Sequence, residues 1–299
     1  MTIGRHLPPT KCHLPLVVIT GPTASGKTSL AITLAKQFNG EIISADSRAI
    51  YIGMDIGSAK PSTDERQGIV HWGFDLVEPG QYFTAADFKA YAEQKVADIR
   101  NRGKLPILVG GTGLYVDAVI FDYQFGQAGD QSRRRELEKM SIEELQDYCA
   151  KHNINLPENS KNKRYLVRAI EQKGINHKRR EDIVDDTIVV GISTDRDVLR
   201  AKIKLRAEQM LTNGVVEEAT LLGKKYGWDN EAMTGNVYPL VRLYLSGEIS
   251  ADEMIDKFTT LDWRLAKRQL TWLKRNPHIY WGDAEQLQSH IASLIEHKL

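Results

Sequence analysis

A glycine-rich loop near the start of the chain carries residues that could do phosphate chemistry. It consists of Gly21, Pro22, Thr23, Ala24, Ser25, Gly26, Lys27 and Thr28. This is the GxxxxGK[ST] pattern, in which backbone N–H groups surround phosphate oxygens. Lys27 supplies a positive charge for the terminal phosphates, and the hydroxyl of Thr28 can hold Mg²⁺. The pattern therefore predicts a site for a phosphorylated ligand, without saying which one.

The segments that flank this loop provide the context that the pattern requires. The apolar run Leu16–Ile19 predicts a buried strand, and Ser29–Ala35 predicts a helix. A strand, a turn and a helix in this order bring a helix N-terminus to the phosphates. A chance match in an ordinary glycine turn is the alternative, and the combination of Lys27, Thr28 and the flanking elements disfavours it.

Polar side chains also follow two later strands. Asp46 comes after a predicted strand at 41–45, and Thr112 comes after a predicted strand at 105–109 and two glycines. Open α/β sheets bind ligands at this carboxyl edge. Asp46 could hold Mg²⁺, act as a general base, or only cap the next turn. The glycines permit close backbone approach beside Thr112, although a plain strand-to-helix turn has the same pattern.

Loops and helices further along the chain give weaker signals. Lys60 is either a phosphate contact or a solvated lysine. Thr84 and Asp87 predict a capping box for a helix that reaches about Arg102, and Ser141 opens another helix in the same way. The expected later elements are a helix at 162–172, a strand at 187–192, a long amphipathic helix after Asp195, and a helical region at 263–275.

Composition limits the class of protein. The 299 residues, 41% of them hydrophobic, are enough for one large or two modest domains, and a net charge of +1 neither favours nor disfavours a nucleic-acid partner. Cys12 and Cys149 lie far apart and have no metal-ligand spacing, so we expect free thiols in a reducing cytosol. No apolar run approaches ~18 residues, and residues 1–13 lack a secretory signal, so we expect neither membrane insertion nor export.

The segment from about residue 122 to 186 has little strand pattern and is rich in basic residues. Between positions 161 and 180 a single acid, Glu171, accompanies eight bases: Lys161, Lys163, Arg164, Arg168, Lys173, Lys178, Arg179 and Arg180. A charge run is usually a solvated face. Its place in a helical insertion beside a phosphate-binding core favours a nucleic-acid backbone as partner. The basic, tryptophan-containing region 263–275 suits either a nucleic-acid strand or aromatic core packing.

Six segments, in order, resemble the tRNA dimethylallyltransferases, a family of P-loop prenyltransferases. They are GPTASGKT at 21–28, ISADSRAIY at 43–51, DIGSAKP at 55–61, LVGGTGLY at 108–115, RYLVRAIE at 164–171 and LAKRQLTWLKR at 265–275. The resemblance implies an α/β fold of the P-loop NTPase type, with three α/β/α layers around a parallel sheet and a small all-helical insertion domain. The catalytic core would comprise 1–122 and 187–299, and the tRNA-binding insertion 123–186.

The resemblance also implies the reaction. A monomer in the cytoplasm would use Mg²⁺ to transfer a dimethylallyl group from dimethylallyl diphosphate to N6 of the adenosine next to the anticodon, in tRNAs that read codons beginning with U. Diphosphate would be released, and the adenine would flip out of its stack to react. The P-loop would hold the donor's diphosphate and bind ATP only weakly, as a mimic.

Site residues follow from the same resemblance. Lys27 and a Mg²⁺ held by Thr28 would offset charge on the leaving diphosphate, and Arg196 would reach the same group. Asp46 would take the proton of adenine N6, and Thr112 would contact the reacting nucleotide. Residues that line the acceptor channel would be Asp46, Ser47, Arg48 and Ala49. The insertion would clamp the anticodon stem-loop through Arg134, Arg164, Tyr165, Leu166, Val167 and Arg168.

The chain departs from the family's pattern at four places. Ala49 stands where Gln is usual, and Asn162 stands where Asp is usual. The segment Asn236–Leu240 keeps only the tyrosine of an IGYKE-like motif, and His71–Gly73 replaces HHL. All four lie outside the P-loop, so the family's phosphate chemistry is expected to be retained more fully than its acceptor recognition.

Three other functions compete with this interpretation. A P-loop small-molecule or nucleoside kinase would transfer or hydrolyse the phosphate of ATP, which a prenyltransferase would not do. Prenyl transfer to free AMP or ADP would not need a helical clamp or a basic C-terminal helix. A non-catalytic RNA-binding protein would have no need of Lys27, Thr28, Asp46, Thr112 and Arg196 together.

Overall fold

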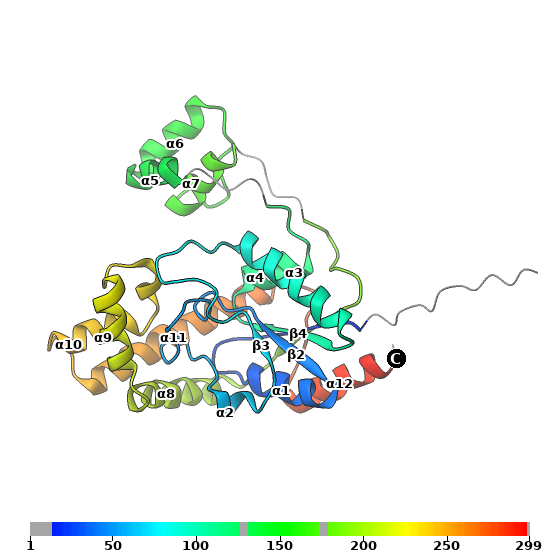
Figure 1. Cartoon of the computed structure of the whole chain (residues 1–299). Helices are drawn as coiled ribbons and strands as arrows, with labels where there is room; N and C mark the ends of the chain where they lie inside the picture. The colour runs from blue at the N-terminus through cyan, green and yellow to red at the C-terminus, as the bar shows by residue number, and fades with distance from the viewer. Residues whose placement is uncertain (1–13, 126–130, 174–178, 298–299) are drawn as a thin grey trace, which may run out of the picture. The chain divides into compact units, whose positions relative to one another are not determined.

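The computed structural model describes residues 14–125, 131–173 and 179–297, and Figure 1 shows their elements. Two compact units make up the chain: Met1–Ile120 with Ile183–Leu299, and the inserted segment Phe121–Asp182. Cys12 and Lys178 lie outside the described residues.

The first unit is built on a six-stranded sheet of the order β3-β2-β4-β1-β5-β6, in which every neighbouring pair is parallel. The strands are β1 (Leu16–Thr20), β2 (Gly40–Ser44), β3 (His71–Trp72), β4 (Leu105–Gly110), β5 (Thr187–Ile192) and β6 (Tyr280–Gly282). Every residue of β1, β2 and β4 is buried, as expected when helices cover both faces of a parallel sheet. The α/β class with a parallel sheet, predicted from the sequence, is confirmed.

Helices cover the two faces of this sheet (Figure 1). On one face, α1 (Lys27–Gln37) and α12 (Ala284–Glu296) share an apolar core with alternate residues of the strands, such as Ile19 and Val190. On the other face lie α3 (Ala85–Asn101) and α4 (Gly113–Ile120), joined by stacking of Phe88 on Tyr115 with ring centroids 4.2 Å apart. Only one turn of helix, α2 (Thr63–Arg66), intervenes between β2 and β3.

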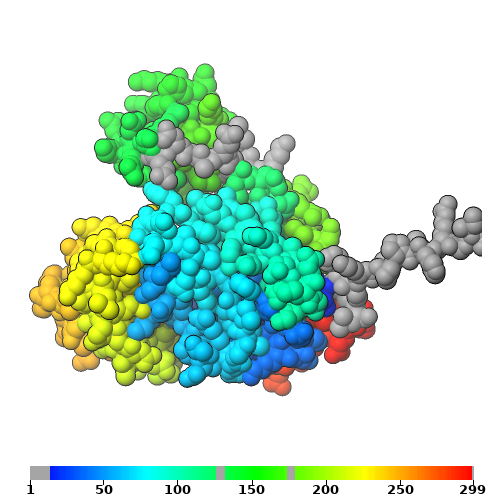
Figure 2. All heavy atoms as spheres, viewed as in Figure 1, coloured from blue at the N-terminus to red at the C-terminus, as the bar shows by residue number. Residues whose placement is uncertain are grey.

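The remaining helices of this unit come from the C-terminal half of the chain. They are α8 (Arg196–Thr212), α9 (Val215–Tyr226), a 3₁₀ turn η1 (Glu231–Thr234), α10 (Tyr238–Leu245) and α11 (Ala251–Leu273). Glu218 of α9 accepts hydrogen bonds from the backbone N–H groups of Asp55, Ile56 and Gly57, and Figure 2 shows the surfaces of these two segments in contact. The segment that follows β2 is thereby fastened to α9.

Helix α11 extends well beyond the region predicted at 263–275, because its capping box starts at Ser250. Trp272 donates from Nε1 to Asp117 Oδ2 of α4 at 2.7 Å. Trp263 packs against the cluster that contains Leu199 and Ile203 of α8. Both tryptophans therefore serve core packing, which was one of the two interpretations of this region.

The second unit contains α5 (Gln131–Lys139), α6 (Ile142–Lys151) and α7 (Lys163–Glu171). Its core consists of Leu137, Leu145, Cys149, Leu166, Val167 and Ile170. Cys149 is a buried free thiol, as predicted. The predicted capping boxes at Thr84 and Ser141 are both present. In the part of the chain that the structure describes, no helix has the length and apolar character of a membrane span.

Candidate active site

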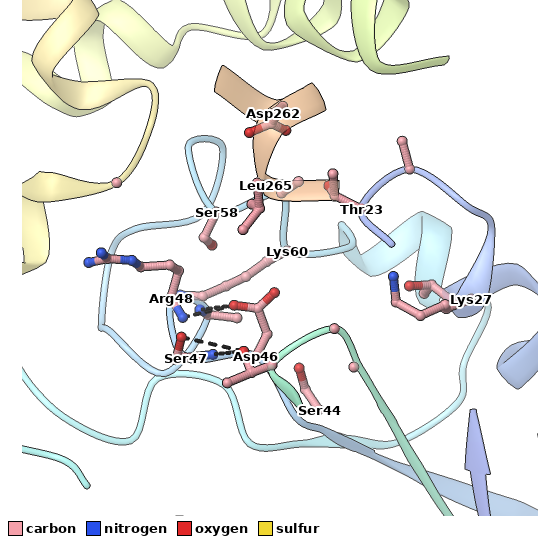
Figure 3. Close-up of a pocket in the computed structure, with 18 of the residues that line it drawn as sticks. Thr23, Lys27, Ser44, Asp46, Ser47, Arg48, Ser58, Lys60, Asp262 and Leu265 are labelled. Atoms are coloured by element: carbon pink, nitrogen blue, oxygen red, sulfur yellow. Dashed lines mark hydrogen bonds between the residues drawn. The ribbon is translucent and has the colours of Figure 1, made fainter. Parts of the chain in front are cut away.

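A cavity of about 460 Å³ lies at the carboxyl ends of β1, β2 and β4 (Figure 3). Its walls come from the P-loop, from the turns after β2 and β4, and from α8, α10 and α11. Predicted residues that line it are Thr23, Ala24, Ser25, Gly26, Lys27, Thr28, Asp46, Ser47, Arg48, Ala49 and Thr112. All of its lining residues belong to the first unit.

The P-loop has the backbone conformation that its glycines were expected to permit. Gly26 is the N-cap of α1, with φ of 95°, in the left-handed region that favours glycine. Lys27 folds back over the loop, and its Nζ donates to the carbonyl oxygen of Pro22 at 2.6 Å. Burial lowers the pKa of Lys27 to about 8, and the nearby Asp46 carboxylate opposes this shift. The hydrogen bond to Pro22 thus holds the Nζ group of Lys27 against the loop.

Asp46 caps its own turn and also faces the cavity. Its Oδ1 accepts hydrogen bonds from the backbone N–H groups of Arg48 (2.8 Å) and Ala49 (3.4 Å). In Figure 3 the second carboxylate oxygen points into the pocket. Capping, one of the three roles considered from the sequence, therefore fixes the side chain while leaving one oxygen for chemistry.

Thr112 lies next to this turn. Its Oγ1 accepts a hydrogen bond from the N–H of Ser47 at 3.1 Å, and its own N–H donates to the carbonyl of Ala45 at 3.3 Å. A Cβ at Gly110 would stand 2.1 Å from that same carbonyl oxygen, so only glycine allows the two turns to approach so closely. The structure therefore brings Asp46, Ser47 and Thr112 together, as the sequence predicted.

Arg48 and Ala49 line the cavity in different ways. The guanidinium of Arg48 donates to the carbonyl oxygens of Glu231 and Ala232 and to Oγ1 of Thr234, so it holds the 3₁₀ turn η1. Ala49 is 3% exposed and contributes only a methyl group. The guanidinium of Arg48, which was predicted to contact the acceptor, is therefore already hydrogen-bonded to protein atoms.

Arg196 does not line the cavity, which corrects its assignment to the phosphate site. It is the first residue of α8, and its guanidinium carbon lies 5.5 Å from the centre of the Trp263 ring. Arg206, further along the same helix, does line the cavity, and its Nη1 donates to Oγ1 of Thr23 at 2.7 Å. Its Nε is buried and has no partner among the described residues. The two arginines are ten residues apart, a rise of ~15 Å, so the helix brings only one of them to the P-loop.

Gln269 of α11 is a second site residue to which the sequence assigned no role. Its Oε1 accepts from the N–H of Thr23 at 2.8 Å, and its Nε2 donates to the carbonyl of Gly111 at 3.1 Å. One amide thereby holds the P-loop and the turn after β4. The residue falls in the segment LAKRQLTWLKR, but sequence spacing alone gave no reason to single it out.

Lys60 lines the cavity and is not a solvated lysine. Its side chain is 2% exposed and forms ion pairs with Asp55 (2.8 Å) and Asp75 (2.6 Å). It also donates to the carbonyl oxygen of Tyr51 at 2.7 Å. Lys60 thus fastens the loop after β2 beside the cavity.

The side chains of the insertion that were predicted to contact RNA fall into three groups. Leu166 and Val167 are buried in its core, so their assignment as RNA contacts is wrong. Arg134 forms ion pairs with Glu138 (3.1 Å) and with the buried side chain of Glu171 (3.5 Å). Arg164 and Tyr165 are exposed and Arg168 is half-buried, which leaves these side chains as the surface of α7.

Metal ligation in this structure would depend on very few protein groups. Within the described residues, no three His, Cys, Asp or Glu side chains form a cluster that could hold an ion. Thr28 and Asp46 do line the cavity described above. This sparse donor set fits Mg²⁺, which keeps several waters and is usually bound through one or two protein groups together with substrate phosphates.

Comparison with known proteins gives a consistent result. A family model described as IPP transferase matches residues 49–276. The chain is 38% identical to the tRNA dimethylallyltransferase of Bacillus mycoides (strain KBAB4), and the match covers 95% of both proteins. It is 37% identical to the enzyme of that name from Bacillus cytotoxicus, again over 95% of both.

Solved structures agree with these sequence matches. The full-length tRNA isopentenylpyrophosphate transferase from Bacillus halodurans is 35% identical, with a TM-score of 0.72 over 95% of this chain and 97% of that one. The corresponding enzyme from Staphylococcus epidermidis is 32% identical, with a TM-score of 0.71 over 95% and 99%. A eukaryotic dimethylallyltransferase acting on tRNA shares the fold, with a TM-score of 0.74 at 23% identity, over 91% of this chain and 74% of that one.

Proposed function

The chain belongs to the IPP transferase family, and from that membership we propose that it transfers a dimethylallyl group from dimethylallyl diphosphate to N6 of the tRNA adenosine next to the anticodon. The observation that carries this proposal is that the P-loop, Asp46 and Thr112 line one cavity. A phosphate site and a carboxylate base therefore face a common space. We extend the proposal to tRNAs that read codons beginning with U.

The P-loop end of the cavity is the proposed donor site. Backbone N–H groups at the start of α1 and the cation of Lys27 would hold the diphosphate. We assign the arginine that contacts the diphosphate to Arg206 in place of Arg196, because Arg206 is hydrogen-bonded to Thr23 within the loop. Mg²⁺, held in part by Thr28, would offset negative charge on the leaving diphosphate.

Asp46 is the proposed general base. The adenine N6 nitrogen forms a bond to C1 of the dimethylallyl group as the bond from C1 to the diphosphate oxygen breaks, and diphosphate leaves with that electron pair. Asp46 accepts the proton that N6 loses. The two backbone N–H groups that donate hydrogen bonds to Oδ1 hold the carboxylate in a fixed orientation.

The acceptor end would receive a single unstacked base. Thr112, Ser47 and Ala49 lie around Asp46 and would contact the reacting nucleotide, which must flip out of the anticodon loop to enter the cavity. Arg48 would act indirectly, by holding η1 at the rim. The methyl side chain of Ala49 cannot form a hydrogen bond, so base recognition at this point would depend on shape.

We also propose that the inserted unit, Phe121–Asp182, binds the anticodon stem-loop. The exposed side chains of Arg164 and Tyr165, with Arg168 beside them, supply positive charge and a stacking surface. Arg134 would support this surface through its ion pair with Glu171. Because one chain supplies the whole cavity, we propose that the protein is a monomer. We also propose that it acts in the cytoplasm, where a tRNA acceptor would be available.

The test is a competition for labelled donor. Radiolabelled dimethylallyl diphosphate and Mg²⁺ are incubated with the protein, unmodified tRNA and AMP together, and ATP turnover is followed separately. We expect label in tRNA alone and no ATP turnover. Label in AMP would overturn the proposed acceptor, and phosphate release from ATP without any prenyl transfer would identify a kinase-type enzyme.

A further inference from the structure

A second acidic side chain lies in the wall of the cavity, on helix α11. Asp262 is 4% exposed and lines the same cavity as Asp46 and Lys27. Figure 3 shows it on the side of the pocket that α11 forms, across from Asp46. A carboxyl group so deeply buried near the proposed diphosphate site needs a physical explanation, because the negative charge of an ionised carboxylate and that of a diphosphate repel each other.

One oxygen of this carboxyl is engaged and the other is available. Nδ2 of Asn236, just before α10, donates to Oδ1 of Asp262 at 2.8 Å. Within the described residues this is the only hydrogen bond to the group. Asn236 is one of the departures from the family's motif, so its contact with Asp262 belongs to this chain's own version of the pocket.

The charged groups around Asp262 come from several elements. Arg206 of α8 and Asp46 after β2 act on it electrostatically, and Lys27, Arg268 and Tyr238 line the same cavity. Burial raises the pKa of Asp262, Asp46 raises it further, and Arg206 and Asn236 oppose the rise. A bound diphosphate adds negative charge to this space and shifts the balance further toward the protonated acid.

Arg206 connects Asp262 to the phosphate end of the cavity. Its Nη1 is bonded to Thr23 of the P-loop, while its charge acts on Asp262. Asp262, Arg206 and Thr23 line the same cavity. A neutral carboxylic acid in that place offers an O–H donor to a phosphate oxygen without adding an opposing charge.

We propose that Asp262 is a substrate-binding carboxylic acid, which takes up a proton from solvent when diphosphate binds and donates it from Oδ2 in a hydrogen bond to a diphosphate oxygen. This inference rests on the proposed function, because it requires a diphosphate at the P-loop. The proton returns to solvent when diphosphate leaves. Affinity for the diphosphate group thereby becomes linked to pH through a residue outside the P-loop.

The test measures proton uptake on binding of inorganic pyrophosphate with Mg²⁺ to the full chain. Calorimetric titrations in buffers of different ionisation enthalpy give the number of protons taken up by the wild-type protein and by Asp262→Asn. The asparagine can accept from Asn236 through Oδ1 and donate to the ligand through Nδ2, but it cannot titrate. Asp256→Asn, an exposed position on the same helix, is the matched control, and circular dichroism checks that each variant is folded.

We expect Asp262→Asn to bind pyrophosphate within about threefold of the wild type while taking up measurably fewer protons, up to one per site. We expect Asp256→Asn to match the wild type in both respects, and Asp262→Ala, which cannot donate, to bind about tenfold more weakly. Equal proton uptake by the wild type and Asp262→Asn would overturn this inference alone. Failure of the folded wild-type protein to bind pyrophosphate would overturn the proposed function as well.

Discussion

At the scale of single residues, Asp46 combines an observed structural role with the proposed role of general base. Its Oδ1 is engaged by two backbone N–H groups, while its other oxygen faces the cavity. An alanine variant would lose both roles, so its phenotype would not separate them. Asp46→Asn keeps the Oδ1 acceptor and removes the base.

We predict that Asp46→Asn lowers the single-turnover rate of prenyl transfer by about 10²- to 10⁴-fold, the usual contribution of a general base. Binding of tRNA, measured by filter retention, should stay within about twofold, because no phosphate contact is lost. Thermal unfolding should also be nearly unchanged, since the capping bonds remain. Undiminished turnover in this variant would rule out Asp46 as the base.

Lys27 gives a prediction about pH. Burial lowers its pKa to about 8, so its positive charge is present below that pH and is lost above it. Affinity for pyrophosphate should therefore fall by up to about tenfold per pH unit above 8. Lys27→Arg stays charged and should show a flatter profile than the wild type. The ligand's own titration is common to both proteins, so superimposable profiles would contradict the assignment.

The residue scale is also where prediction from sequence was least complete. Lys27, Thr28, Asp46 and Thr112 are recognisable because each follows a predicted strand or a glycine turn. The choice between Arg196 and Arg206 depends on which face of α8 meets the P-loop. Arg206 lies on the apolar face between Ile203 and Met210. A basic residue on a buried helix face is the feature of the sequence that could have identified it as a site residue.

At the scale of elements, the central strands could be predicted because each is a short apolar run. The edge strands β3 and β6 have only two and three residues, so no periodicity marks them. Leu166 and Val167 were misassigned because the motif that contains them mixes exposed and buried faces of α7. Gln269 went unrecognised because its two partners, Thr23 and the carbonyl of Gly111, are distant in sequence.

The edge of the sheet carries a charge network that affects stability. Glu41 of β2 has a side chain 2% exposed, and it accepts hydrogen bonds from Arg102 at the end of α3, from Lys104 (2.8 Å) and from Trp72 (2.8 Å). These partners lower the pKa of Glu41 to about 2, the hydrogen bond from Arg102 having the largest effect. The network ties β2, α3 and β3 together.

We predict that Glu41→Gln lowers the free energy of unfolding at neutral pH, by about 3 kcal/mol if the full pKa shift is realised. The folded-state pKa lies below the unfolded value, so the contribution is complete above about pH 4.5 and is lost as pH falls toward 2. Urea titrations of both proteins from pH 3 to 7 should show the difference shrinking at low pH. A constant difference would mean that the charge is not its source.

At the scale of the whole molecule, the proposed chemistry and the proposed RNA recognition fall in different units of the chain. The first unit contains the entire cavity, whereas the inserted unit has its own small core and a basic α7 surface. The order of the motifs made the α/β class and the family predictable. The sequence alone could not tell which basic residues are structural and which are exposed, because this depends on how α5, α6 and α7 pack together.

We predict that Arg164→Ala weakens tRNA binding and reduces the slope of log affinity against log salt by about 0.7 to 0.9, the loss of one phosphate contact. Arg133→Ala is a comparison within the same unit, because Arg133 donates to the hydroxyl of Tyr148. Turnover at saturating tRNA should change little in either variant. An unchanged salt slope in Arg164→Ala would show that Arg164 does not contact the RNA backbone.

We propose that the cavity joins a diphosphate site to a base for adenine N6. The most direct test maps the product nucleoside by mass spectrometry, after incubation of the protein with dimethylallyl diphosphate, Mg²⁺ and a tRNA that reads codons beginning with U. We predict one dimethylallyl group, on N6 of the adenosine next to the anticodon, absent when that adenosine is replaced by guanosine and nearly absent with Asp46→Asn. Modification that persists in the guanosine-substituted tRNA, or that lies on another atom, would rule out this reaction.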